Sequence, residues 1–192
     1  LSTAPKPDCR PPPVRGKVAI MLIRRETPAD QAAIHAVHSE AFRREPGVTP
    51  IEAPLVDELR ADGDLINPLS LVAVRDGAVV GHVCCSRARL GADPAIAVGL
   101  GPLGVLPAHQ KSGVGSALVH AVVGAADALG HGLVVLLGDP AYYSRFGFVT
   151  ASDLSITAPD PQWGPHFQAR TLAAYEPTQA GAFEYAPAFS RI

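Results

Sequence analysis

One segment of this 192-residue chain limits the possible folds more than any other. An apolar stretch ends at Val105, and a short loop, Gln110-Lys-Ser-Gly-Val-Gly115, then leads into a helical pattern that begins Ser116-Ala-Leu-Val. A strand followed by a glycine-containing loop at a helix N-terminus leaves several backbone N–H groups unpaired, and an anion can bind there. Gly113 and Gly115 place no side chain between that backbone and a phosphate. The segment therefore predicts a pyrophosphate-binding loop.

Two other phosphate-binding motifs are excluded by their context. Gly99-Leu-Gly-Pro-Leu-Gly104 matches the Gly-x-Gly-x-x-Gly pattern of dinucleotide folds. However, Pro107 and the polar loop follow it where a helix should begin, and no strand carries an acidic residue at the ribose spacing. The P-loop pattern needs a glycine directly before its lysine, and Lys111-Ser112 lacks that glycine.

The loop resembles the signature of the GNAT superfamily of acetyltransferases, Gln/Arg-x-x-Gly-x-Gly/Ala after a strand, which Gln110, Gly113 and Gly115 meet in full. A second segment, Tyr142-Tyr-Ser-Arg-Phe-Gly-Phe148, is similar to an aromatic-Tyr-x-x-x-Gly-Phe stretch of that family. The layout of residues 21–192 resembles the YhbS-type branch. The resemblance implies an α/β fold in which helices flank a mixed β-sheet and two splayed central parallel strands hold acyl-CoA.

The resemblance also implies roles for particular residues. Backbone groups of Leu103, Gly104 and Val105 would pair with pantetheine, and the Val105 N–H would donate to the developing oxyanion. Tyr143 occupies the general-acid position and Tyr142 is expected to pack beside it. The residues expected to cradle the diphosphate are Gln110, Lys111, Ser112, Gly113, Val114, Gly115 and Ser116.

The general base is not marked by any motif. Glu52 aligns with an acid of this branch, but it also completes a capping box, Thr49-Pro-Ile-Glu52, and we favour the capping role. His82 is expected to be structural, because a single histidine on a strand usually is. Cys84 and Cys85 lie next to each other on a predicted strand, and direct transfer is expected rather than a thiol intermediate.

The expected function is transfer of an acetyl group from acetyl-CoA to the amine of a small molecule or a peptide, by direct attack. Two alternatives stay open: a CoA-binding regulatory module without turnover, and an acyltransferase that uses a longer acyl-CoA. A net charge of −2 and the lack of a long Lys/Arg run argue against nucleic acid as a partner. The protein is expected to be a monomer or a homodimer.

Composition sets the remaining expectations. No apolar stretch approaches the roughly 18 residues of a membrane helix, and three cysteines do not form a disulfide framework, so a cytoplasmic location is expected. The seven histidines show no metal-ligand spacing, so no metal is expected. Residues 1–20 are proline-rich and predict a disordered leader or extension, and residues 21–192 predict one domain.

Local patterns predict the order β-α-α-β-β-β-α-β-α-β. Thr27-Pro-Ala-Asp30 marks a helix start, and Asp76-Gly77 marks a hairpin turn. The helix after the glycine loop is expected to end at Gly130. The predicted strands are Met21–Thr27, Ser70–Arg75, Ala78–Arg87, Ala95–Val105, Leu133–Leu137, Ser155–Ala158 and Phe183–Tyr185, with a helix opening at Asp139-Pro140.

Overall fold

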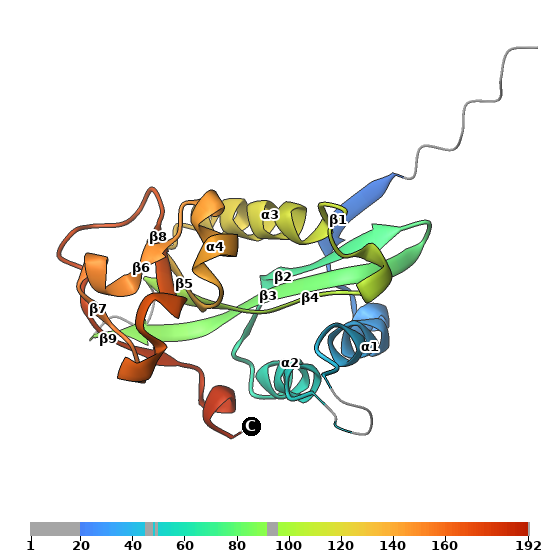
Figure 1. The fold of residues 1–192 in the computed structure, drawn as a ribbon, viewed down its shortest axis with the longest axis horizontal. Coiled ribbons are helices and arrows are strands. Elements are labelled where there is room, and N and C mark those ends of the chain that lie inside the picture. Colours follow the sequence, from blue (N-terminus) through green and yellow to red (C-terminus); the bar gives the residue numbers. More distant parts are fainter. Residues whose placement is uncertain (1–19, 45–47, 49, 92–95, 192) are drawn as a thin grey trace, which may run out of the picture.

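A mixed β-sheet runs through the computed structural model of the chain, which describes residues 20–44, 48, 50–91 and 96–191 (Figure 1). The strand order is β1-β2-β3-β4-β5-β8-β6, and the β4–β5 pair is the parallel one along this path. β9 pairs with the far end of β3 and with β7. The strands are β1 (Met21–Arg25), β2 (Leu65–Arg75), β3 (Ala78–Leu90), β4 (Ala97–Val105), β5 (Leu133–Leu137), β6 (Val149–Thr150), β7 (Ile156–Thr157), β8 (Phe167–Thr171) and β9 (Gly181–Tyr185).

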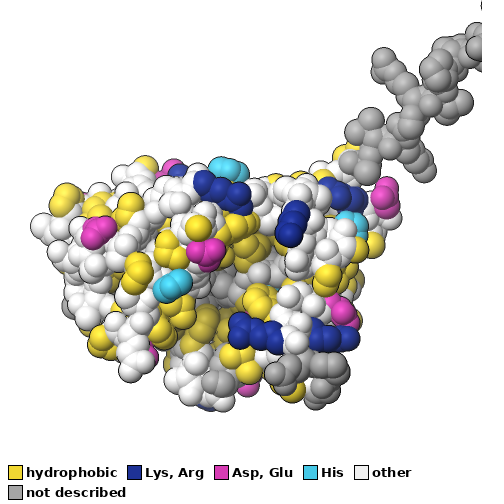
Figure 2. Space-filling view, viewed as in Figure 1, with side chains coloured by type: hydrophobic (Ala, Val, Ile, Leu, Met, Phe, Trp, Pro, Cys, Tyr) yellow, Lys and Arg dark blue, Asp and Glu magenta, His cyan; other side chains and the backbone are white. Residues whose placement is uncertain are grey.

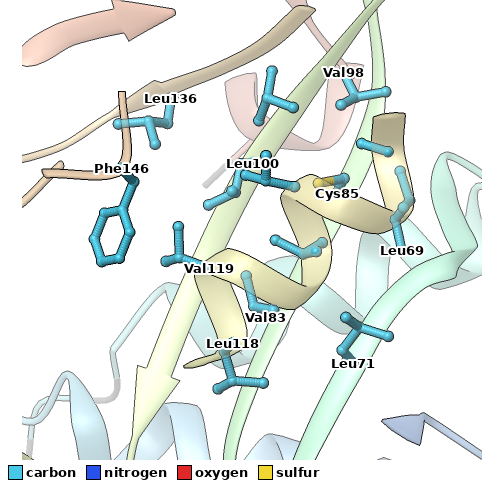
Figure 3. Close-up of a cluster of buried hydrophobic side chains, with 14 of the residues drawn as sticks. Leu69, Leu71, Val83, Cys85, Val98, Leu100, Leu118, Val119, Leu136 and Phe146 are labelled. Atoms are coloured by element: carbon cyan, nitrogen blue, oxygen red, sulfur yellow. The ribbon is translucent and has the colours of Figure 1, made fainter. Parts of the chain in front are cut away.

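Helices cover both faces of the sheet, as predicted (Figure 1). The helices are α1 (Gln31–Ala41), α2 (Glu52–Ala61), α3 (Val114–Ala128) and α4 (Pro140–Tyr143). α1 and α2 lie on one face, and α3 packs on the other. Side chains alternate between the faces of a strand, so neighbouring Cys84 and Cys85 are buried in different core clusters. Figure 3 shows the cluster under α3, where Cys85 lies among aliphatic side chains.

The predicted elements are present, but several have different bounds. β2 begins at Leu65 rather than Ser70, and β3 runs to Leu90, because its far end gains β9 as a partner. β8 was not predicted, since Phe-Gln-Ala-Arg-Thr carries little apolar alternation. Its pairing with β5 and β6 supplies the stability that its own sequence pattern does not indicate. Ala95 lies outside the described residues.

The predicted capping box of α2 is wrong. The helix begins at Glu52, and Ile51 is its N-cap, so Glu52 occupies the first helical position rather than the third. A capping box needs its acid at the third position, where the side chain can reach back to the N-cap N–H. Thr49 lies outside the described residues. Glu52 is therefore available for a role other than capping.

β4 changes its pairing along its length, and this opens the sheet. β4 pairs with β5 only from Ala97 to Gly99. A register shift against β3 between Val83 and Cys85 makes a bulge at Gly101-Pro102. The extra residue reverses which side chains of β4 point to which face of the sheet. Leu103 and Val105 therefore pack on the α3 side. Beyond Gly99 the two parallel strands diverge, which is the splay that the resemblance implied.

The first turn after β1 is held by a buried carboxylate. The Asp30 carboxylate accepts two hydrogen bonds from the Arg24 guanidinium at 2.7 and 2.9 Å. It also accepts one from the Thr27 N–H at 2.7 Å and one from the Thr27 hydroxyl at 2.8 Å. The Arg24 hydrogen bonds, more than any other cause, hold the pKa of Asp30 well below its usual range. The start signal at Thr27 thus folds into a short 3-10 turn that leads into α1.

We expect Asp30→Asn to lower the free energy of unfolding by about 1–2 kcal/mol at pH 7, because it removes the ion pair and weakens the cap. The folded pKa of Asp30 is lowered, so its contribution is present above the unfolded pKa of about 4 and is lost as pH falls further. Urea unfolding of the parent and the variant at pH 7 and at pH 3 measures the loss of unfolding free energy at each pH. Asp62→Asn, at an exposed pair with Arg191, is the control and should change little. An equal deficit at both pH values would contradict this assignment.

The predicted leader, residues 1–20, lies outside the described residues except for Ile20. Within the described part of the chain, no helix combines the length and the apolar character needed to cross a membrane.

Candidate active site

The glycine loop and the splayed end of β4 border one cavity of about 720 Å³, named here the loop cavity. Two cationic side chains, Lys111 and Arg145, lie in its lining, and no acidic side chain does among the described residues. The Arg145 guanidinium stacks 4.1 Å above the Tyr142 ring, which fixes the charge at the edge of the cavity. The lining comprises Ala41, Phe42, Leu103, Val105, Gln110, Lys111, Gly113, Gly115, Ser116, Tyr142 and Arg145.

The backbone of the loop is arranged to receive an anion. Lys111 and Gly113 both adopt positive φ, +56° and +88°, and Gly113 is the N-cap of α3. The first intrahelical bond runs from the Ala117 N–H to the Gly113 carbonyl. The N–H groups of the preceding turn have no partner within the helix, so they and the positive end of the helix dipole face the cavity. Anion-binding loops use this kind of local geometry.

Gly115 is required for a second reason. A Cβ at this position would lie 2.8 Å from the Tyr142 hydroxyl oxygen, which is closer than such atoms approach. The glycine thus lets α4 bring Tyr142 over the loop. The signature residue serves packing as well as access to the backbone.

The open edge of β4 carries the backbone groups of Leu103 and Val105. The Leu106 N–H donates to the Val80 carbonyl on β3 at 2.9 Å. Alternate residues of an antiparallel strand present their backbone to opposite edges, so Leu103 and Val105 present theirs to the gap left by β5. Gly104 presents its backbone to β3 instead, and a Cβ there would lie 2.7 Å from His38 Nδ1.

Three of the predicted cofactor residues do not line the cavity: Gly104, Ser112 and Val114. The Ser112 hydroxyl donates to the His109 carbonyl at 2.7 Å, and Val114, the first residue of α3, points into the core. The Gln110 amide lines the cavity but donates to the Val105 carbonyl at 3.0 Å. These side chains hold the loop in shape, and the backbone and the two cations are left to meet a ligand.

A second cavity, of about 540 Å³, lies on the other side of the splay and is named here the aromatic cavity. It shares Phe42 and Leu103 with the loop cavity, so the two meet at the open edge of β4. Figure 2 shows this hollow lined by hydrophobic side chains, between the N-terminal helices and the C-terminal segments. Its lining comprises Phe42, Ile51, Glu52, Leu55, Leu100, Gly101, Pro102, Leu103, Leu137, Gly138, Tyr143, Trp163, Tyr185 and Phe189.

Tyr143 lines the aromatic cavity, and its neighbour Tyr142 lines the loop cavity. Its ring stacks edge-on against Tyr142 and Phe148, with centroids 4.9 and 5.7 Å apart. The ring packs so closely on Gly138 that a Cβ there would lie 2.4 Å from it. Burial raises the pKa of Tyr143 to about 12, with a smaller contribution from Tyr142. The phenol is therefore protonated at neutral pH and can act as a proton donor.

Glu52 is the charged residue of the aromatic cavity among its described lining residues. Other acids of α1 and α2 are paired elsewhere: Glu40 with Arg43, and Asp57 with His35 and Arg60. Among the described acids of these two helices, Glu52 is therefore the one that lines this cavity.

His82 belongs to a buried polar network and lines neither cavity. Its Nδ1 lies 2.8 Å from His38 Nε2, and its Nε2 lies 2.9 Å from the Ser70 hydroxyl. The Ser70 hydroxyl donates to Glu26, which also pairs with Arg60. Burial lowers the pKa of both histidines, although Glu26 opposes this at His82. The network ties the segment after β1 to β2, β3, α1 and α2, and it gives these buried polar side chains hydrogen-bond partners, although His38 Nδ1 has none.

Both cysteines of β3 are buried, and burial raises the pKa of each thiol. Neither lines a cavity, so neither offers a thiolate to a ligand. Among the described residues, no three His, Cys, Asp or Glu side chains come together in a way that could hold a metal ion.

Sequence reasoning missed several residues of the two cavities. Arg145 stands inside the aromatic motif, and its position one helical turn after Tyr142 could have indicated a cation at the loop. Phe42, Trp163 and Phe189 come from segments without a motif. Only the fold brings them to the splay.

Comparison with known proteins identifies the fold and the family. The profile of the acetyltransferase (GNAT) domain matches residues 67–150. The N-acetyltransferase YhbS of Escherichia coli strain K12 is 37% identical over 154 residues, which are 80% of this chain and 88% of YhbS. The crystal structure of YhbS from Escherichia coli in complex with CoA has a TM-score of 0.84 at 34% identity, with 92% of this chain and 96% of that chain covered.

A GNAT family acetyltransferase of Brucella melitensis, crystallised in complex with acetyl-CoA, has a TM-score of 0.73 at 36% identity, with 89% of this chain and 99% of that chain covered. These similarities confirm the predicted fold class and the resemblance to the YhbS-type branch. Because the identity extends over most of both chains and the fold is shared, this chain belongs to the GNAT family of N-acetyltransferases.

Proposed function

We propose that this protein transfers the acetyl group of acetyl-CoA directly to an amine. The observation that carries the proposal is the junction of the two cavities at Leu103, where the open edge of β4 faces both. One cavity presents cations and free N–H groups to an anion, and the other presents Tyr143 and an apolar surface. Two reactants can therefore meet at one strand edge, as group transfer requires.

The loop cavity fits the diphosphate of acetyl-CoA. The N–H groups at the start of α3, together with Lys111 and Arg145, match the charge of that group. The Val105 carbonyl already accepts from Gln110, so the Leu103 backbone and the Val105 N–H are the groups left to pair with an extended amide-bearing arm, in the manner of an added strand. YhbS and the Brucella melitensis relative were crystallised with CoA and acetyl-CoA, which supports the same ligand here.

Direct transfer assigns three tasks to groups of this chain. The Val105 N–H stabilises the negative charge on the acetyl oxygen as the amine nitrogen attacks the carbonyl carbon. The C–N bond forms and the C–S bond breaks, and the Tyr143 hydroxyl gives its proton to the departing sulfur. The proton lost by the nitrogen returns through solvent to Tyr143. The buried, undissociated thiols of Cys84 and Cys85 support a route without a thiol intermediate.

We also propose that residues 21–192 form a single catalytic domain. β1 is paired with β2 at one end of this range. Near the other end, Arg191 forms ion pairs with Glu58 and Asp62 of the α2 region. Both ends of the described chain are thus attached to the same sheet-and-helix core.

The test has two readouts. We expect acetyl-CoA at 100 times its Kd to stabilise the folded protein by about 2.7 kcal/mol, which raises the melting temperature. We also expect free thiol to appear only when an amine is added. Binding without thiol release from any amine would instead indicate a CoA-binding regulatory module. No effect of acetyl-CoA on melting would contradict the assignment of the loop cavity.

A further inference from the structure

The aromatic cavity has a composition that selects among amines, and the following inference rests on the proposed function. Its volume of about 540 Å³ suits a small molecule. Two of its lining residues, Ile51 and Leu137, are 54% and 47% exposed despite being large and apolar. Most of the other lining side chains are also apolar or aromatic, as is typical of small-molecule sites. The natural occupant is therefore largely apolar.

Three rings from the C-terminal part of the chain form one wall of the cavity. Trp163 comes from the 3-10 segment Pro161–His166, Tyr185 from β9, and Phe189 from the 3-10 segment Pro187–Ser190. The Tyr185 centroid lies 4.6 Å from that of Phe189 and 6.2 Å from that of Trp163. Burial raises the pKa of Tyr185, as expected where water is scarce. The wall offers ring faces and edges to a flat apolar group.

One carboxylate faces this apolar surface. Glu52 opens α2 and lines the cavity. It also borders a neighbouring cavity together with Arg44, and no ion pair between these two side chains is found in the described part of the chain. A single acid can match one ammonium group. A second ammonium in the cavity would lie against rings without a counter-ion, which is costly in a dry site.

From these observations we propose that the acceptor is a small primary amine joined by a short alkyl chain to an aromatic ring. The ring packs on the wall of Trp163, Tyr185 and Phe189, and the ammonium is drawn to Glu52. The amine then reaches the junction with the loop cavity, beside Tyr143. After losing one proton to solvent the nitrogen attacks the acetyl carbon as described above.

The experiment measures thiol release from acetyl-CoA by the full chain with matched amines. We expect kcat/KM for 2-phenylethylamine to exceed that for ethylamine by roughly 10- to 100-fold, since burying a ring adds favourable apolar contact. 1,4-Diaminobutane, with a second charge and no ring, should be the poorest of the three.

Substitutions at two lining residues test which side chains determine the amine preference. Glu52→Gln should raise the KM for 2-phenylethylamine by about 10-fold and leave the KM for acetyl-CoA unchanged, whereas Asp57→Asn, on the same helix but outside the cavity, should change neither. Trp163→Leu should reduce the preference for 2-phenylethylamine over ethylamine to a few-fold. Phe189→Leu tests the same wall if Trp163→Leu melts much earlier than the parent.

The outcomes separate this inference from the proposed function. Equal rates with all three amines, or a preference for the diamine, would overturn the aromatic-amine assignment and leave the transferase proposal standing. Faster use of a longer acyl-CoA than of acetyl-CoA would assign the aromatic wall to the acyl chain. That result would also overturn the aromatic-amine assignment. Binding of acetyl-CoA without thiol release from any amine would overturn both proposals.

Discussion

Tyr143→Phe should slow turnover by roughly 10²- to 10⁴-fold at saturating acetyl-CoA and amine, the range typical of a lost general acid. The substitution keeps the ring that stacks on Tyr142 and Phe148 and that packs on Gly138. It removes only the hydroxyl that would protonate the departing thiolate. The dissociation constant for acetyl-CoA should therefore change little, because Tyr143 lines the aromatic cavity and not the loop cavity.

The pH dependence sharpens this test. Burial raises the pKa of Tyr143 to about 12, so the phenol stays protonated throughout the usual assay range. The ratio of parent to variant turnover should then be constant from about pH 7 to pH 10, the upper limit being set by the ordinary phenol pKa. A ratio that collapses near pH 10 would mean that Tyr143 titrates as an exposed phenol and would contradict the buried position.

Tyr142→Phe is the matched control. Tyr142 is the adjacent phenol, but it lines the loop cavity and supports Arg145. Its loss should weaken acetyl-CoA binding at most and should leave the turnover number within a few-fold. If both phenol-to-phenyl variants keep full turnover, protonation of the leaving sulfur does not depend on either residue, and the general-acid role of Tyr143 is wrong.

The parts of the site that are backbone features could be predicted from the sequence. The glycine loop is a local structure, because positive φ at Gly113 and the start of α3 depend on residues next to one another in the chain. The same holds for the turn at Asp76-Gly77, where both residues have positive φ. Such features do not depend on what packs against them. The sequence therefore predicted the strand, loop and helix that frame the loop cavity.

The aromatic cavity could not be predicted because it is assembled from distant segments. Phe42 follows α1, whereas Trp163 and Phe189 lie in a proline-rich region with weak periodicity. The capping box predicted at Thr49-Pro-Ile-Glu52 failed for a related reason. The Thr-x-x-Glu pattern is satisfied by sequence spacing alone, but the packing of Leu55 and Val56 against β2 and the C-terminal segment fixes where α2 begins.

Gly113→Glu should weaken acetyl-CoA binding by at least about 100-fold and abolish its effect on the melting temperature. Two causes combine. Gly113 has φ of +88°, a conformation that costs a non-glycine residue about 1–2 kcal/mol. The loop of the free variant is expected to relax, so binding has to restore the strained conformation and loses that energy. A carboxylate placed at the N-terminus of α3 also repels the diphosphate that the free N–H groups and Lys111 attract. Such repulsion at 4 Å ranges from about 1 kcal/mol in bulk water to about 4 kcal/mol near a protein surface.

Two matched variants separate these causes. Gly113→Gln has the same strain and almost the same size without the charge, so its loss of affinity should be about 10-fold or less. Gly130→Glu carries the same charge at a position with φ of +81°, after the other end of α3, and should bind acetyl-CoA like the parent. A Cβ at either glycine meets no atom within 4 Å, so steric clash does not obscure the comparison. Titration calorimetry gives each dissociation constant. Equal affinities for Gly113→Glu and Gly113→Gln would remove the electrostatic argument, and parent-like affinity in Gly113→Glu would place the diphosphate away from this loop.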